Sequence, residues 1–150
     1  MIGSTTVYDI RNFGARPDGE TLCTEAIATA IEACATAGGG TVHVPAGRFL
    51  TGPVRLRSHV HLHLEAGAHL IFSQDPAHYP LVETRWEGKE VLTHCPQIYG
   101  FDLERVAVTG YGVIDGSGEI WWRLFREKKL TYPRPRSIVF VRCRDVLVEG

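Results

Sequence analysis

The sequence predicts an all-β fold: a solenoid of short strands in parallel sheets, closed at its N-terminal end by one α-helix. One observation is that short runs of alternating apolar and polar residues follow one another closely over residues 38–67. Another is that the apolar, polar and glycine pattern of Phe101–Gly110 recurs at Val141–Gly150. Repeated units of this kind bury their apolar rows only by stacking on neighbours, which favours a solenoid.

The stretch 38–67 shows how the predicted strands follow one another. Because apolar and polar residues alternate, each strand has one buried face and one exposed face, and His61 and His63 fall on the exposed face. The breaks between strands are too short for crossover helices and lack the Asn-Gly or Asp-Gly turns of tight hairpins. Bends between consecutive strands are therefore expected at Pro45-Ala46-Gly47, Gly52-Pro53 and Arg57-Ser58-His59.

The N-terminal segment supplies a first strand and a helix. We expect a strand over residues 7–13, a polar turn at Arg16-Pro17-Asp18-Gly19 and a helix over about residues 24–37. Thr24 can cap the start of that helix, and Gly38-Gly39-Gly40 ends it. Its apolar residues recur at helical spacing, so the helix is expected to cover the open end of the solenoid; they are Ile27, Ala30, Ile31 and Cys34.

Composition limits the function classes. The chain has 150 residues, 44% hydrophobic and 22% charged, which suits one globular domain. A net charge of −1 gives no whole-protein argument for nucleic acid or an anionic membrane as partner. Residues 1–6 lack the basic start and apolar core of a signal peptide, so a cytoplasmic location is favoured, with secretion open if the N-terminus was trimmed.

The cysteines and histidines show no metal-ligand spacing. No CxxC or paired Cys/His motif is present, so neither a metal nor a cofactor is expected. We interpret the cysteines as core thiols; they are Cys23, Cys34, Cys95 and Cys143.

Two segments interrupt the regular pattern, at about residues 73–96 and 117–136, and we expect both to be irregular insertions between coils. Insertions in repeat proteins often gather on the binding side. The second combines aromatic residues with an excess of Lys and Arg, which would suit an anionic sugar polymer.

Simpler interpretations of single residues in the second insertion, and of Asp115 just before it, stand beside this one. Lys128 and Lys129 can be a solvated face, Trp121 and Trp122 can anchor a short helix, and Asp115 can form a turn.

An ordered series of motifs runs along the chain: Asn12-Phe13-Gly14-Ala15, Asp18-Gly19, Ala26-Ile27, Gly38-Gly39-Gly40, Val44-Pro45-Ala46-Gly47, Gly67-Ala68, Gly110-Tyr111-Gly112-Val113-Ile114-Asp115-Gly116-Ser117-Gly118 and Trp121-Trp122. This series resembles the opening of the polygalacturonases, glycoside hydrolase family 28. The segment Arg85-Trp86-Glu87-Gly88 is more similar to the bacterial exo-acting members. The resemblance implies a right-handed parallel β-helix and an enzyme that hydrolyses α-1,4-galacturonide linkages of polygalacturonate or oligogalacturonides with inversion.

The family's later motifs are absent from these 150 residues. Polygalacturonases resemble one another most at an Asn-Thr-Asp, an Asp-Asp, a Gly-His-Gly and an Arg-Ile-Lys, none of which occurs here. We therefore expect residues 1–150 to be the N-terminal segment of a single β-helix domain, inactive alone, with the catalytic residues beyond Gly150. Candidate substrate-binding residues within the chain are Arg85, Trp86, Glu87, Trp122 and Arg136.

Two other functions stay open at this point. A pectate lyase would keep the fold but needs calcium, and the sequence supplies no clustered carboxylate ligands. A non-catalytic β-helix, such as a tailspike or adhesin, would share the repeats but has less reason to carry the Ile-Asp-Gly-Ser-Gly and Trp-Trp motifs. The sequence leaves endo or exo action and the oligomeric state open.

Overall fold

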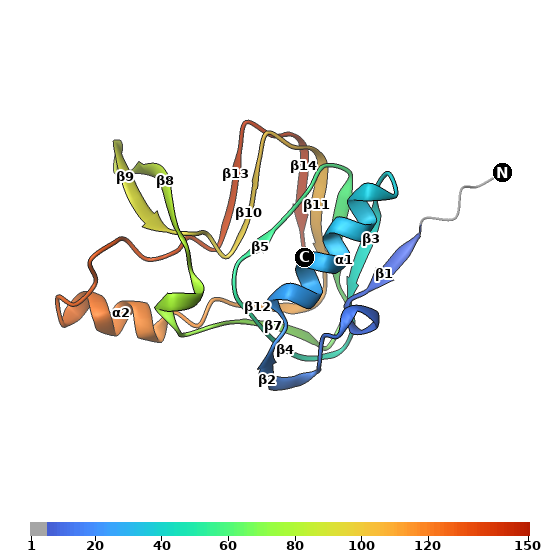
Figure 1. Cartoon of the computed structure of the whole chain (residues 1–150), viewed down its shortest axis with the longest axis horizontal. Coiled ribbons are helices and arrows are strands. Elements are labelled where there is room, and N and C mark those ends of the chain that lie inside the picture. Colours follow the sequence, from blue (N-terminus) through green and yellow to red (C-terminus); the bar gives the residue numbers. More distant parts are fainter. Residues whose placement is uncertain (1–5) are drawn as a thin grey trace.

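A computed structural model describes residues 6–150 of the chain (Figure 1). Three parallel sheets run along the molecule, and we name them A, B and C. Sheet A has the order β1 (Val7–Asp9), β3 (Gly40–Val44), β6 (Val60–Leu64), β11 (Glu104–Gly110) and β14 (Arg144–Glu149). Sheet B has the order β12 (Val113–Asp115), β7 (Ala68–Phe72), β4 (Gly47–Thr51) and β2 (Asp18–Leu22). Sheet C has the order β13 (Ile138–Val141), β10 (Ile98–Phe101) and β5 (Val54–Arg55).

The chain visits sheets A, B and C in turn, so each circuit forms one coil of a parallel β-helix. The register stacks equivalent residues of successive coils, with Val42 beside Leu62, Leu62 beside Val108, and Val108 beside Val148. Val42, Leu62 and Val108 are buried between the sheets. The predicted fold is thereby confirmed, and the repeat between residues 101–110 and 141–150 is the pairing of adjacent coils.

The first coil differs from the prediction at two places. The expected strand over residues 7–13 was wrong beyond Asp9, because Ile10–Phe13 forms the 3-10 helix η1. The Asp9 carboxylate accepts the Arg11 N–H at its start, and Gly14, with φ of 103°, closes its end. The polar turn expected at Arg16-Pro17-Asp18-Gly19 is confirmed only in part: Asp18 Oδ1 accepts the N–H groups of Glu20 and Thr21, but Asp18 also begins β2 and pairs with β4.

Helix α1 (Thr24–Thr36) confirms the predicted capping helix. It lies between β2 and β3, at the place in the coil where later coils have a strand of sheet C, and it contacts β1, β3, β5 and β6 (Figure 1). Its predicted core residues are all buried: Ile27, Ala30, Ile31 and Cys34. Thr24 does not cap it as predicted. Cys23 is the N-cap residue, and Thr24 Oγ1 instead accepts the Gly52 N–H at 2.7 Å.

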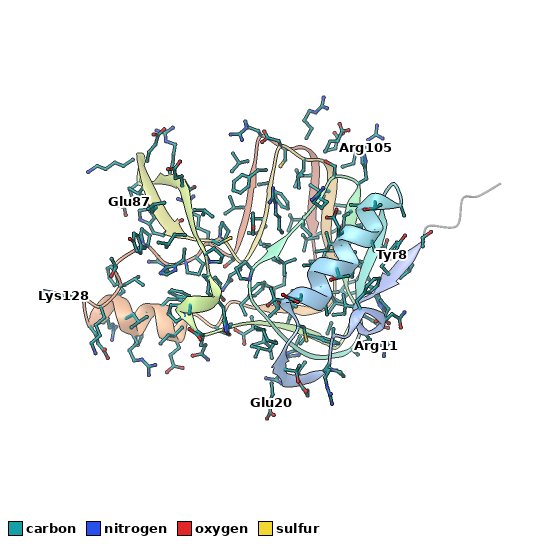
Figure 2. All side chains as sticks on the ribbon, viewed as in Figure 1. Tyr8, Arg11, Glu20, Glu87, Arg105 and Lys128 are labelled. Atoms are coloured by element: carbon teal, nitrogen blue, oxygen red, sulfur yellow. The ribbon has the colours of Figure 1, made fainter. Side chains whose placement is uncertain are left out.

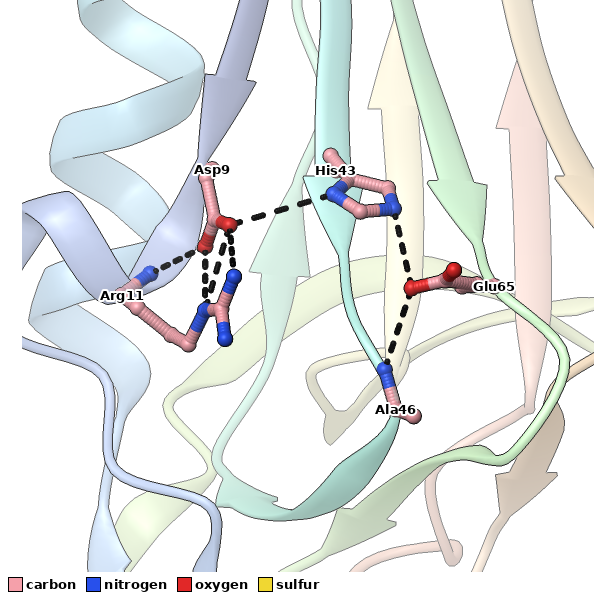
Figure 3. A network of polar contacts seen from close by, with 5 residues as sticks. All are labelled: Asp9, Arg11, His43, Ala46 and Glu65. Atoms are coloured by element: carbon pink, nitrogen blue, oxygen red, sulfur yellow. Dashed lines mark hydrogen bonds and ion pairs between the residues drawn. The ribbon is translucent and has the colours of Figure 1, made fainter.

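A polar network crosses the outer face of sheet A and joins its first three coils (Figure 3). His43 Nδ1 lies 4.0 Å from Asp9 Oδ2, and His43 Nε2 lies 3.5 Å from Glu65 Oε2. Arg11 donates to the Asp9 carboxylate, and this hydrogen bond holds the pKa of Asp9 below its usual value. Side chains from neighbouring coils therefore bind one another on the polar face as well as in the core.

Both insertions leave the solenoid at the same corner, between sheet B and sheet C. In the second coil this corner is only Gly52-Pro53, but one insertion separates β7 from β10 and the other separates β12 from β13. The first was expected to be irregular, and this was wrong. It contains the 3-10 helix η2 (Pro76–His78) and an antiparallel hairpin of β8 (Leu81–Trp86) and β9 (Lys89–His94).

The hairpin turns at Glu87 and Gly88, which have positive φ of 49° and 82° and so match the twist of the two strands. The second insertion contains helix α2 (Glu119–Arg126). Figure 1 shows the hairpin and α2 projecting together from one side of the solenoid. Neither α-helix within residues 6–150 is long and apolar enough to cross a membrane.

Candidate functional site

The two insertions meet at Trp86, at the end of β8. The guanidinium of Arg136 lies 5.0 Å from the centre of the Trp86 ring, and that of Arg134 lies 5.6 Å from it. Arg136 Nη2 also donates a 2.6 Å hydrogen bond to the carbonyl oxygen of Arg85. We call Trp86, Arg134 and Arg136 the Trp86 cluster. It joins the indole of Trp86, in the first insertion, to two guanidinium groups of the second insertion.

Arg85 and Glu87 do not join this cluster through their side chains. Neighbouring residues in a strand point to opposite faces, so the Arg85 side chain points away from that of Trp86. Arg85 Nη2 donates to the Gly88 carbonyl oxygen at 3.2 Å. Glu87 lies in the hairpin turn, at the tip of the insertion (Figure 2). Of the predicted binding residues on the hairpin, only Trp86 therefore meets Arg136 through its side chain, whereas Arg85 meets it through its backbone carbonyl oxygen.

The two adjacent tryptophans of α2 have different surroundings. Trp121 is buried, with its ring centre 5.1 Å from that of Tyr79 and 4.8 Å from that of His94, and it anchors α2 to the first insertion. Trp122 is 54% exposed, and the Arg126 guanidinium lies 3.8 Å from the centre of its ring. The interpretation as a helix anchor is confirmed for Trp121 and wrong for Trp122, which is available to a ligand.

A surface groove runs between the half-buried Trp86 and the exposed Trp122. One part of it, of about 300 Å³, is lined by Trp86, Phe125, Tyr132 and Arg134 among others, and the predicted binding residue Glu87 also borders it. The next part, of about 700 Å³, is lined by Trp122, Phe125 and Arg134 together with Gly118 and Glu119. Phe125 and Arg134 border both parts. We call the whole the insertion groove, since both of its walls come from the insertions.

Arg134 was missed as a site residue, although the sequence contains a pattern that could have identified it. Arg134 and Arg136 flank Pro135, and a residue before proline is held in an extended conformation. In an extended chain, side chains two positions apart point to the same side. Both guanidinium groups can therefore reach Trp86, which the charge count of the insertion did not reveal.

The outer face of sheet C carries a second set of aromatic and cationic side chains that was not predicted. Tyr99 lies beside Arg55 in the register, and the ring centres of Tyr99 and Phe101 are 5.6 Å apart. Burial raises the pKa of Tyr99 to about 12, so its hydroxyl stays protonated at neutral pH. The alternation of β10 places these side chains on the face opposite buried Ile98.

One further contact fixes the second insertion to the solenoid. Gln97, directly before β10, donates its Nε2 to the Gly116 carbonyl oxygen at 2.7 Å. Asp115 accepts the Ser117 N–H at 2.9 Å, which confirms its interpretation as a turn former. Within residues 6–150 no group of three or more His, Cys, Asp or Glu side chains is placed to hold a metal ion.

Comparison with known proteins gives similarities that span nearly the whole chain. A solved exopolygalacturonase from Thermotoga maritima matches 97% of the chain, with a TM-score of 0.85 and 38% sequence identity. A probable polygalacturonase from Vitis vinifera is 35% identical over 148 residues, or 93% of the chain. The chain belongs to the polygalacturonase-like group of glycoside hydrolase family 28.

Other matches agree with this family. An exo-poly-alpha-D-galacturonosidase from Dickeya chrysanthemi is 34% identical over 75% of the chain. The family description "Rhamnogalacturonase A/epimerase, pectate lyase-like" matches residues 7–69. The chain spans 40% of the Thermotoga protein, 30% of the Vitis protein and 20% of the Dickeya protein. The chain, with the coils and insertions described above, thus corresponds to less than half of the length of each of these proteins.

Proposed function

We propose that the protein containing this chain is an exo-acting polygalacturonase, which hydrolyses α-1,4-galacturonide linkages of pectin or oligogalacturonides with inversion. The observation that supports this most is the similarity to the Thermotoga exopolygalacturonase, because it covers both insertions as well as the coils. The name of the Dickeya relative also describes exo action.

The Trp86 cluster has the chemistry to bind a galacturonide residue. A guanidinium group can hold a sugar carboxylate through two parallel hydrogen bonds, and an aromatic face can stack on the apolar face of the ring. One donor of Arg136 is already engaged by the Arg85 carbonyl oxygen, which orients the guanidinium beside Trp86. We assign Arg136 and Trp86 to substrate binding and Arg85 to the hairpin wall.

The acid and base of an inverting hydrolase stand about 6.5–9.5 Å apart, with a water molecule between them. The Asn-Thr-Asp and Asp-Asp motifs that the family resemblance associates with catalysis are absent from the 150 residues. We therefore propose that both catalytic carboxylates belong to other coils of a longer protein. The role of the present chain is then to form part of the sugar-binding surface beside those coils.

The test is kinetics of the longer protein on galacturonide oligomers. Arg136→Ala should lower kcat/KM by an amount that corresponds to a loss of about 1.5–3 kcal/mol in transition-state stabilisation, because a charge-assisted hydrogen bond to substrate is removed. Arg136→Lys should recover little, because an ammonium cannot form the planar bidentate contact. Exposed Lys128 lies outside the cluster, and Lys128→Ala is the matched control.

The products decide between mechanisms. Exo action releases small products from the earliest time points, and the 150-residue chain alone should release no reducing ends. Unsaturated products would identify a lyase and contradict the proposed activity. Full activity in well-folded Arg136→Ala protein would contradict the assignment of Arg136 to substrate binding.

A further inference from the structure

Helix α2 exposes aromatic side chains on one face. Trp122 is 54% exposed and Phe125 is 65% exposed. Residues three positions apart lie on the same side of a helix, so these two rings form one continuous surface. The buried Trp121 already attaches the helix to the first insertion. The exposed rings are therefore not needed to hold α2 in place.

Unpaired positive charge surrounds these rings. Within residues 6–150, Lys129 pairs with Glu127 at 2.8 Å, but Arg123, Arg126 and Arg134 have no carboxylate within ion-pair distance. Because the whole chain has a net charge of −1, this local excess of cations is a property of the second insertion. An anionic partner would satisfy it.

The groove beside α2 is better suited to bind a sugar chain than to bind a partner with a flat surface. Its volume of about 700 Å³ is bordered by Trp122, Phe125 and Arg134, and Glu119 adds an acceptor for sugar hydroxyl groups. Each residue of a polyuronate has one carboxylate and an apolar ring face, which match a guanidinium and an aromatic ring placed side by side. Through Phe125 and Arg134 the groove continues to the Trp86 cluster.

We propose that the α2 part of the insertion groove is a second binding site for an anionic polysaccharide. It holds a part of a polyuronate chain distant from the residue at the Trp86 cluster, with Trp122 and Phe125 as stacking surfaces and Arg126, whose guanidinium lies over the Trp122 ring, as carboxylate partner. Arg134, which belongs to the Trp86 cluster, borders both sites. This assignment rests on the proposed function for the identity of the polymer. Long chains reach both sites at once, so the second site raises affinity for polymer more than for digalacturonate.

The experiment measures binding of polygalacturonate and of digalacturonate to the purified protein by calorimetry. Trp122→Ala and Arg126→Ala should each weaken polymer binding by about fivefold or more, and digalacturonate binding by less. Binding should also weaken with added salt. The matched controls are Tyr111→Ala, which removes an aromatic side chain that is 86% exposed elsewhere, and Lys128→Ala, which removes a cation outside the groove.

The outcomes are distinct from those for the proposed function. Polymer binding that depends on Trp122, in a protein without hydrolytic activity, supports the second site and removes the proposed activity. Hydrolysis together with unchanged polymer binding in both α2 variants overturns the second site alone. Anionic vesicles and single-stranded DNA are tested as alternative ligands. If the α2 variants lose binding to one of these ligands but keep binding to polygalacturonate, the proposed second site is also overturned. Circular dichroism establishes that each variant is folded.

Discussion

Two imidazole rings share one hydroxyl on the outer face of sheet A. His61 Nε2 lies 2.5 Å from Thr109 Oγ1, and His63 Nδ1 lies 2.9 Å from the same atom. The hydroxyl has one proton, so one ring accepts it through a neutral nitrogen while the other ring donates to the oxygen. Burial, and then the charge of His63, lower the pKa of His61 and favour its neutral form.

This contact predicts a loss of stability in mild acid. Because the pKa of His61 is lower in the folded state, its stabilising contribution is complete above the unfolded pKa of about 6.5 and is lost as the pH falls through the folded pKa. The effect should be on the order of 1 kcal/mol. Urea unfolding at about pH 7.5 and about pH 5 measures it. His61→Gln should reduce the difference between the two pH values, whereas His69→Gln, on sheet B, should keep it.

At the residue scale, the sequence identified side chains better than it identified their partners. Trp86 and Arg136 were both predicted, and they meet, but Arg85 was grouped with Trp86 only because it is adjacent in sequence. In a strand, adjacency places two side chains on opposite faces. That reasoning requires knowing that residues 81–86 form a strand, and the irregular insertion predicted there concealed it.

At the scale of elements, glycine marks the close approach of neighbouring coils. Gly110 ends β11 with φ of 115°, and a Cβ atom there would overlap the carbonyl oxygen of Leu64 in the preceding coil. Gly118 is the N-cap residue directly before α2, with φ of −65°, and no atom of a residue other than its chain neighbours lies within 4 Å of the position its Cβ would take. The two glycines therefore differ in both backbone conformation and available space.

Alanine at these two positions should have unequal consequences for stability. Gly110→Ala should lower the free energy of unfolding by about 1–3 kcal/mol, because it combines backbone strain with a steric clash. Gly118→Ala should stay within about 0.5 kcal/mol of the unmodified protein. Chemical denaturation followed by circular dichroism measures both. Equal stability of the two variants would mean that the coils can separate at β11 without cost.

Elements with a strongly buried face were predicted well, and elements at the surface were not. Helix α1 was found within one residue of its end, since its four core positions recur at helical spacing. The hairpin was missed because both of its faces are partly exposed, which weakens the alternation, and because its turn is Glu87-Gly88 instead of Asn-Gly.

For the whole molecule, the repeat was enough to predict the coils but not the position of the insertions. The pattern shared by residues 101–110 and 141–150 follows from stacking, which requires similar residues in similar places. Which corner each insertion leaves from depends on how the sheets are arranged. Since Arg134 approaches Trp86 only because both insertions leave from the corner between sheets B and C, the insertion groove could not be derived from the sequence.

The arrangement of sheet A predicts how the 150-residue chain behaves in solution. Strand β14 forms one edge of the sheet, and its Val146, Leu147 and Val148 are 40%, 50% and 54% exposed. Val146 and Val148 align with the buried Val106 and Val108 of the preceding coil. An exposed strand edge next to an apolar surface is a template for pairing with another chain.

We therefore expect the 150-residue chain to associate as its concentration rises. Val148→Lys should reduce this association, because an inward-facing charge at a strand edge opposes pairing. Tyr111→Lys, which places the same charge on a residue that is 86% exposed away from this edge, should have little effect. Sedimentation velocity over a range of concentrations distinguishes the variants. A compact monomer at every concentration would show that β14 is protected without a partner, and equal loss of association in both Lys variants would indicate a general effect of charge instead of pairing at this edge.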